Sequence, residues 1–448
     1  MTQQQPIPIC LFTYNINKQP INESLLSDKL MDELPIKLSD LYCFGLQEFC
    51  SILDGCFHSN ANQILINFNS FLLCLLNDKY GVNFQTLAMD HIGSTGIILL
   101  SPYAFKFQNI KIGKSSVGYF NSSMKGGVGV RLTYSPRGKY DTQKVEISIL
   151  SCHLNAYEGE YYYNLRKEKL NTIIRSLDFK DGYGLIKPYN HIFIMGDLNF
   201  RTAKEFKSDS VETTKLFAIN DPSMLNGEDN IISLNEELDE LTKGLREGEI
   251  LVGFSESEIK FQPTYKYHLN TSIYNSKRSP SWCDRILYLN TYETSDIDDF
   301  KLNLTKTKLP KHEIFPIINK YSSIDSILLS DHKPVILDIT IPFKPPKSII
   351  NELSGCLQIL PLSLNNEAKF NNLGSLKSLS LEENVANGPT TIYLKPTKLD
   401  FLVQNINRPV VDWLLGHSLW LTTTQNGRLL VFIILLMLWS VWYVGGST

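Results

Sequence analysis

The alternation of strand-like and helix-like stretches over residues 1–343 constrains the fold more than any other feature of the chain. Apolar residues at helical spacing predict helices near residues 60–76, with Asn60 as a candidate cap, and 165–177. Short β-branched or alternating runs predict strands at residues 7–14, 41–46, 96–100, 127–132, 145–152, 192–195, 286–289 and 335–341. This mixture predicts a layered α/β protein, a two-sheet β-sandwich flanked by helices.

The length and the composition limit the organisation and the partners. A chain of 448 residues can hold one large two-sheet domain and an appendage, and we predict that domain to be residues 1–343. The formal net charge of -3 is not that of a nucleic-acid-binding protein, so we expect no nucleic-acid partner. The eight cysteines have no paired spacing typical of zinc sites, and we expect reduced thiols.

The C-terminus is strongly apolar. Residues 429–444 (LLVFIILLMLWSVWYV) contain no charge, and at ~1.5 Å per residue they span roughly 24 Å of a hydrocarbon layer of about 30 Å. A buried core helix is the alternative, but such a helix normally has a polar face. We predict a single-pass transmembrane tail anchor at residues 429–446, with the main body in the cytosol. The short span favours the thin membrane of the endoplasmic reticulum.

Residues 344–428 are predicted to link the two parts. The stretch from residue 344 to about 398 is rich in Leu, Ser and Asn without clear periodicity, which is typical of a linker. Residues 401–421 are more apolar and include Trp413 and Trp420. This segment either rests on the membrane surface or docks on the main domain as a helix, and the sequence leaves both alternatives open.

A first candidate for chemistry is the sequence Gly196-Asp197-Leu198-Asn199, which follows a predicted buried strand. Alternate residues leaving a strand share a face, so the carboxylate and the amide point the same way. Asp197 could then accept a proton from water while Asn199 donates to an oxyanion. The same two residue types are also common turn formers. His153 and His332, at other strand ends, could likewise be structural histidines.

Several short segments together identify a resemblance. Residues 279–287 (SPSWCDRIL), 263–267 (PTYKY) and 194–201 (IMGDLNFR) resemble signature blocks of the inositol polyphosphate and phosphoinositide 5-phosphatases. Residues 13–17 (TYNIN), 47–48 (QE), 125–127 (KGG), 151–154 (SCHL) and 330–335 (SDHKPV) match further elements of that family in the same order, over roughly residues 8–343. With its apolar tail, the whole chain resembles the tail-anchored fungal members of the endoplasmic reticulum.

The resemblance implies a deoxyribonuclease-like sandwich and Mg²⁺-dependent hydrolysis of phosphate monoesters. It implies that Glu48 is the main metal ligand with Asn15 beside it, and that Asp197 orients and deprotonates the attacking water. Further implied roles are contact with transition-state oxygens for Asn199, donation to the phosphate for His153 and His332, orientation of His332 for Asp284, and an acidic group near the metal for Asp331. A 4-phosphate would be gripped by Tyr265, Lys266 and Arg278.

The implied substrate is a phosphoinositide lipid, phosphatidylinositol 4,5-bisphosphate, hydrolysed to phosphatidylinositol 4-phosphate. A soluble inositol polyphosphate is an alternative substrate, and a non-catalytic phosphoinositide-binding tether is an alternative function. The chain departs from the family pattern where Ile194 replaces Trp, Phe200 replaces Tyr and Tyr14 replaces Trp. Ser276 stands where relatives often have Lys, which puts the strength of 4-phosphate binding in question.

Overall fold

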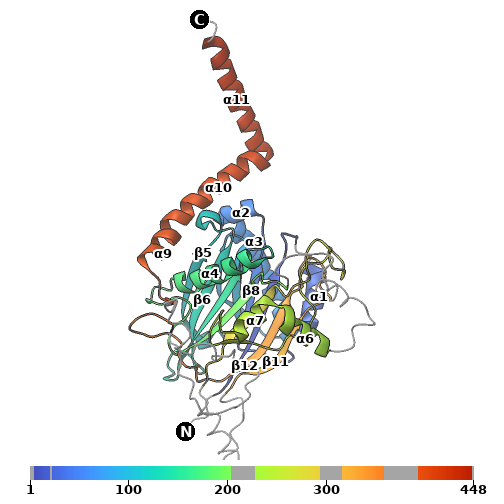
Figure 1. Cartoon of the computed structure of the whole chain (residues 1–448). Helices are drawn as coiled ribbons and strands as arrows, with labels where there is room; N and C mark the ends of the chain where they lie inside the picture. Colours follow the sequence, from blue (N-terminus) through green and yellow to red (C-terminus); the bar gives the residue numbers. More distant parts are fainter. Residues whose placement is uncertain (1–4, 21–22, 203–227, 293–314, 358–391, 446–448) are drawn as a thin grey trace, which may run out of the picture.

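The computed structural model describes residues 5–20, 23–202, 228–292, 315–357 and 392–445. Two six-stranded sheets pack face to face, with helices on their outer faces (Figure 1). The first sheet has the order β11-β12-β1-β2-β4-β3 and the second β5-β6-β7-β8-β10-β9. The predicted helix-flanked sandwich is confirmed.

Each sheet contains one parallel pair of strands among antiparallel neighbours. In the first sheet, β1 (Ile7–Asn15) runs parallel to β2 (Leu41–Gln47), and α1 (Glu23–Glu33) lies between them in the chain. In the second, β7 (Val145–His153) runs parallel to β8 (Asn190–Asp197), and α4 (Glu160–Ser176) lies between them. Parallel neighbours need such a crossover, which brings the carboxyl ends of both strands to one edge.

The remaining strands complete the sheets by antiparallel pairing. All eight predicted strands are present. Four others were not predicted from the sequence. The twelve-strand set is completed by β3 (Gln85–Ile92), β4 (Thr95–Ser101), β5 (Phe107–Ser116), β6 (Gly126–Tyr134), β9 (Phe254–Glu256), β10 (Asp284–Leu289), β11 (Ile317–Ser323) and β12 (Val335–Ile341).

The four strands missed by the periodicity, β3, β5, β9 and β11, are the four edge strands of the two sheets. Three of them contain a register shift, between Thr86 and Ala88, Gln108 and Lys111, and Ile318 and Lys320. A bulge inserts a residue and interrupts the alternation of inward and outward side chains. Edge strands are also partly exposed, so their apolar pattern is weak.

Three apolar layers hold these elements together. The central layer lies between the sheets and contains Leu11, Leu99, Ile149 and Met195. The second covers the outer face of the first sheet under α1 and α3 (His58–Tyr80), and the third covers the second sheet under α4 and α7 (Glu240–Arg246). The helix α3 begins at His58 after the cap residue Phe57, so the prediction of Asn60 as its cap is wrong.

Part of the predicted linker packs on the main body. Ile349, Ile350 and Leu394 are 1–3% exposed and belong to the layer over the second sheet. The predicted linker thus includes positions with fixed contacts on the body, and residues 358–391 lie outside the described residues. The main body thus recruits apolar side chains from beyond residue 343, and that domain boundary stays a prediction.

The C-terminal residues form three consecutive helical segments and a long apolar helix. These are α9 (Lys398–Leu402), a π-helical turn (Val403–Asn407), α10 (Arg408–Thr423) and α11 (Gln425–Gly445). Figure 1 shows α10 across the end of the body beside α2 (Ile52–Cys56), and α11 turning away from it. Gln425–Tyr443 is long and apolar enough to cross a membrane, by length and composition.

Candidate active site

The candidate site lies where the two parallel pairs end. Asn15 is the last residue of β1 and Asp197 the last residue of β8, and His153 is paired in register with Asp197. The backbone at Gly196 has a φ of 143°, and a Cβ there would lie 1.9 Å from the carbonyl oxygen of Cys152. Only glycine fits this approach, so Gly196 allows β8 to turn Asp197 into the site.

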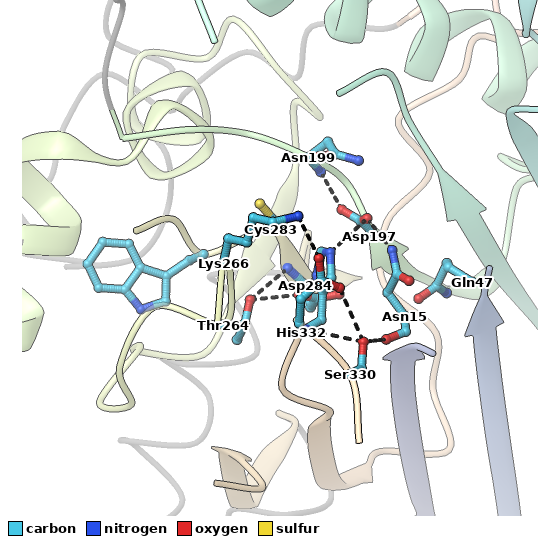
Figure 2. A network of polar contacts seen from close by, with 12 residues as sticks. Asn15, Gln47, Asp197, Asn199, Thr264, Lys266, Cys283, Asp284, Ser330 and His332 are labelled. Carbon is cyan, nitrogen blue, oxygen red and sulfur yellow. Dashed lines mark hydrogen bonds and ion pairs between the residues drawn. The ribbon is translucent and has the colours of Figure 1, made fainter. Parts of the chain in front are cut away.

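Asp197 belongs to the polar network in Figure 2 and is 1% exposed. Its Oδ2 accepts a hydrogen bond from Asn15 Nδ2 at 2.8 Å and lies 3.2 Å from Nε2 of His153 and 3.9 Å from Nε2 of His332. Its Oδ1 accepts from the backbone N–H of Asn199 at 3.1 Å. Burial opposes ionisation, but the two histidines outweigh it and hold the pKa of Asp197 well below its ordinary value.

His332 forms a buried ion pair with Asp284. The Nδ1 of His332 lies 2.9 Å from Oδ2 of Asp284, and the same oxygen accepts a hydrogen bond from Thr264 Oγ1 at 2.7 Å. Burial alone would lower the pKa of His332, but the carboxylates of Asp284 and Asp197 raise it to about 9. His332 is therefore positively charged at neutral pH.

His153 is in a different environment, because its ring contacts the ammonium group of Lys125. Burial, together with Lys125, lowers the pKa of His153. Burial also lowers the pKa of Lys125, although the carboxylates of Glu48 and Asp197 oppose this effect. Because lysine starts from an ordinary pKa of 10.5 and histidine from 6.5, we assign the positive charge of this pair to Lys125.

Glu48 is the most accessible carboxylate of this group, with a side chain 24% exposed. Its backbone φ is 47°, and non-glycine residues in that region often mark functional positions. Burial raises the pKa of Glu48, but the opposing effect of His153, Lys125 and Lys18 is larger. The pKa is therefore lowered, and the carboxylate is ionised. Lys18 Nζ lies 3.0 Å from Oε2, which shows that this carboxylate attracts a cation.

The oxygen groups near Glu48 fit a hard divalent cation. Oxygen ligands are those that Mg²⁺ prefers, and Glu48 supplies an ionised carboxylate. Asn15 is held nearby with its Oδ1 accepting from the backbone N–H of Asn17 at 3.0 Å, which leaves a second lone pair. Among the described residues, Asp197, Asp284 and His332 also lie close enough to share an ion. Glu48 is more accessible than these three buried residues, which favours it as the metal ligand.

Asn199 and Asp331 have more local partners than the sequence indicated. One N–H of the Asn199 side chain donates to the carbonyl of Leu154 at 3.1 Å, and its Oδ1 accepts from Arg201. One side-chain N–H thus remains for an oxyanion. Asp331 accepts from Lys266 Nζ at 2.7 Å, so the structure pairs this carboxylate with a predicted substrate-binding residue.

The predicted phosphate-gripping residues divide into two groups. The Tyr265 ring packs against His332 with centroids 4.5 Å apart, and Lys266 Nζ lies 5.3 Å from the centroid of that same ring. Arg278 lies farther out, with its guanidinium 5.7 Å from the Tyr157 ring centroid. The loop that carries Arg278 is hydrogen-bonded to Lys266: the backbone N–H of Asn275 donates to the Lys266 carbonyl at 2.7 Å.

Two cations of the site received no role from the sequence. Lys125 precedes Gly126-Gly127 at the start of β6 and reaches His153. Arg201 is 1% exposed, and its guanidinium lies 4.5 Å from the Tyr265 ring centroid. Both belong to motif segments that were recognised, KGG and GDLNFR. The motif order could therefore have indicated them, but their contacts come from distant parts of the chain.

The three apolar departures from the family pattern are all in the core. Ile194, Phe200 and Tyr14 are 0–1% exposed. Phe200 packs against Tyr163 with ring centroids 6.1 Å apart. These replacements thus change the support of the site and leave its polar groups in place.

All eight cysteines are free thiols.

Comparisons with known proteins agree with this geometry. Endonuclease/Exonuclease/phosphatase family 2 matches residues 12–338. The phosphatidylinositol 3,4,5-trisphosphate 5-phosphatase 2A of Danio rerio is 24% identical over 361 residues, which cover 74% of this chain and 24% of the fish protein. The type IV inositol polyphosphate 5-phosphatase 11 of Arabidopsis thaliana is 28% identical over 221 residues, 48% of this chain and 52% of that protein. The chain thus spans about a quarter to a half of these relatives.

Solved structures show the same fold. The inositol polyphosphate 5-phosphatase domain of SPsynaptojanin, in complex with inositol (1,4)-bisphosphate and calcium ion, has a TM-score of 0.56 and 22% identity, covering 75% of this chain and 85% of that chain. A mutant of Cimex nitrophorin, as its ferrous NO complex, reaches 0.50 with 18% identity, covering 75% and 99%. One sandwich thus serves unrelated functions, and only the residues of the site discriminate between them. By the match over residues 12–338, the chain belongs to endonuclease/exonuclease/phosphatase family 2, in which its curated relatives are inositol phosphate and phosphoinositide 5-phosphatases.

Proposed function

We propose that this chain is a Mg²⁺-dependent phosphoric monoester hydrolase that removes the 5-phosphate of phosphatidylinositol 4,5-bisphosphate. The observation that carries the proposal is the ionised Asp197 held between two positive groups, Lys125 with His153 on one side and His332 on the other. A carboxylate can align a water molecule, and the cations can neutralise a phosphate in the same small volume. The relatives named above act on such phosphates.

In this mechanism Asp197 orients the attacking water and accepts its hydrogen bond. A carboxylate of low pKa is a weak base, so its alignment of the water contributes more than its proton affinity. His332 donates from Nε2 to a phosphate oxygen, while Asp284 holds its Nδ1. Lys125 and the free N–H of Asn199 stabilise the negative charge of the transition state.

Glu48 and Asn15 would hold the magnesium ion. When bound, this ion supplies a Lewis acid that neutralises charge on the phosphate and the leaving oxygen. The membrane is proposed to be that of the endoplasmic reticulum, with α11 as a single-pass tail anchor and the body in the cytosol. The support is the apolar composition of Gln425–Tyr443.

Recognition of the 4-phosphate is assigned to Lys266, Tyr265 and Arg278. Lysine binds phosphate as a point charge and arginine as a fork. In the structure Lys266 is paired with Asp331 at 2.7 Å, so an incoming phosphate competes with an internal carboxylate. We therefore expect weaker recognition of the 4-phosphate than a free lysine would give.

The test is phosphate release from short-chain phosphatidylinositol 4,5-bisphosphate by the full chain. We expect Mg²⁺-dependent release that EDTA abolishes, and a loss of at least about a thousandfold in Asp197→Ala. The matched control is Asp78→Ala, because Asp78 is exposed near the end of α3, away from the site. Undiminished release by Asp197→Ala, or no release by the wild type, would overturn the mechanism.

Two parallel substrates decide between the alternatives. Faster release from soluble inositol 1,4,5-trisphosphate than from the lipid would favour the soluble polyphosphate as the substrate. Binding of the lipid without release would favour a non-catalytic tether. The presence of Glu48, Asp197, Asn199 and His332 argues against the tether. These four residues are assigned to hydrolysis, and a protein that only binds the lipid would not need them.

A further inference from the structure

The segments that precede α11 are fixed to the body on one face. Their inward side chains recur every four residues, at Asp400, Gln404, Arg408, Asp412 and Gly416. The π-helical turn at 403–407 adds residues per turn, which helps this spacing to stay on one side. Asp400 begins the row with an ion pair to α4, in which Arg175 Nε and Nη2 lie 3.0 and 2.9 Å from its oxygens.

The next contacts hold the loop between β5 and β6. Gln404 is buried and makes three hydrogen bonds with Ser116, at 2.8 Å to the N–H, 2.9 Å to the hydroxyl and 3.1 Å to the carbonyl. Asp412 accepts from the N–H and the hydroxyl of Ser123 at 2.7 and 2.5 Å. The loop is thus tied at both ends. Lys125 of the candidate site comes two residues after Ser123.

The last inward residue brings α10 against α2. A Cβ at Gly416 would lie 2.9 Å from Cβ of Cys56 and 3.2 Å from the Phe57 ring, so the absent side chain allows this close approach. The helix α2 begins four residues after Glu48. Both segments that α10 contacts therefore lead directly to site residues, which places α10 at the active-site end of the sandwich (Figure 1).

The opposite face of the same segments is an exposed apolar stripe. Its side chains recur at helical spacing and are each half or more exposed: Leu399, Leu402, Ile406, Val410, Trp413 and Leu414. Between Arg408 and Arg428 the only charged residue is Asp412, which points inward. A contiguous apolar face of this kind is typical of a helix that lies in a membrane interface.

Continuity with α11 identifies the occupant of the stripe. The helix α10 ends at Thr423 and α11 begins at Gln425, so a single residue separates the helix that carries the stripe from the apolar helix that is the candidate membrane span. If α11 crosses a bilayer, the C-terminal end of α10 must lie close to its surface. A soluble partner would have to fit between the bilayer and the stripe.

We propose that the outward face of α9 and α10 docks on the bilayer that α11 enters, and that their inward contacts hold the active-site end against that same bilayer. The proposal rests on the proposed function as a membrane-anchored lipid phosphatase. Because the body is tied at Asp400, Gln404, Asp412 and Gly416, it is not a domain on a free tether. Its substrate is then the lipid of its own membrane, and lipid of an apposed membrane is a poor substrate.

The experiment reconstitutes the full chain in phosphatidylcholine vesicles. Long-chain phosphatidylinositol 4,5-bisphosphate is placed either in the same vesicles or in separate ones at equal total concentration. We expect release from the same vesicles to be at least about tenfold faster, because tethering raises the local concentration. The variant Val410→Glu/Trp413→Glu should lose about fivefold or more of that rate. Its rate on short-chain lipid in solution should stay within about twofold, because neither side chain contacts the site.

The matched control is Ile36→Glu/Leu353→Glu, since these two side chains are 96% and 98% exposed elsewhere on the body. It should leave both rates unchanged. Quenching of tryptophan fluorescence by lipids brominated near the head group gives an independent measurement, and Trp413→Phe should remove part of the quenched signal. This quenching reports docking even if the chain hydrolyses no lipid. A failure of the proposed function can therefore be distinguished from a failure of the docking proposal.

An unchanged same-vesicle rate in Val410→Glu/Trp413→Glu, with normal short-chain hydrolysis, would overturn the docking proposal. Equal rates on the two vesicle arrangements by the wild type would overturn the claim that the body is held to its own membrane. If the double variant fails to insert or to hydrolyse short-chain lipid, the docking proposal is decided by comparing the quenching of Trp413→Phe with that of the wild type. Quenching identical to the wild type would then exclude contact of Trp413 with lipid.

Discussion

The two sides of Asp197 present a positive charge in two different ways. On one side, His153 is kept neutral by burial and by Lys125, and the lysine carries the charge. On the other side, His332 itself carries the charge, because Asp284 overcomes the effect of burial. The comparison teaches that a buried histidine takes its charge state from its neighbour, so two histidines beside the same carboxylate can differ in charge.

Between the two sides of Asp197, the larger effect is expected from removing the carboxylate behind His332. In Asp284→Asn the buried imidazolium loses its counter-charge, so the pKa of His332 falls and the ring is neutral at neutral pH. We expect kcat on short-chain lipid to fall about a thousandfold, as for other residues that set the charge of a catalytic histidine. A loss of less than about tenfold would show that the charge on His332 contributes little.

A smaller loss is expected on the other side of Asp197. In Lys125→Met the positive charge disappears, but the pKa of His153 then rises because its repulsive neighbour is gone. His153 can therefore replace part of the lost charge, and we expect kcat to fall only about a hundredfold. Lys139→Met is the control, since Lys139 is exposed on the loop after β6. A loss larger than that of Asp284→Asn would reverse the comparison.

The pH profile distinguishes the two histidines directly. The pKa of His332 is raised to about 9, so the imidazolium is present at neutral pH and is lost as the pH rises through about 9. We expect kcat/KM on short-chain lipid to fall about tenfold per pH unit above that value. The contribution of this ion pair to the free energy of unfolding is fully present below the ordinary pKa of 6.5. It is lost as the pH rises from there through about 9.

The pH profiles of two variants, Asp284→Asn and His153→Gln, provide the control. Asp284→Asn should move the alkaline limb to lower pH, because its effect acts through His332. His153→Gln should lower the rate without moving that limb, because His153 is not the titrating group. A wild-type limb near the ordinary histidine value would contradict the assignment of charge to His332.

The smallest effect is expected at the hydroxyl that supports Asp284. Thr264 donates to Asp284 Oδ2 at 2.7 Å, and Thr264→Val removes that bond while keeping the shape of the side chain. We expect a loss of about threefold in kcat and of about 1 kcal/mol in the free energy of unfolding. Thr86→Val is the matched control, because its hydrogen bond to Asn69 is exposed. Equal losses in both variants would show that the Asp284 contact has no special role.

The sequence by itself determined the central part of the fold and most of the site. The eight interior strands were predictable, because strands buried between neighbours are strongly apolar or alternate regularly. Through the family resemblance, the short motifs at strand ends pointed to Glu48, His153, Asp197, Asp284 and His332 as candidate site residues. These signals are local, so they can be read without knowing the contacts.

Only the tertiary structure decided the edges, the charges and the docking of the tail. The edge strands β3, β5, β9 and β11 were missed because exposure and bulges interrupt their pattern. The charge states of His153 and His332 depend on Lys125 and Asp284, which approach from distant segments. In the inward row, Asp412 meets a partner 289 residues away, and hydropathy along the chain cannot show that. Long-range contacts set burial and charge, and a local pattern contains neither.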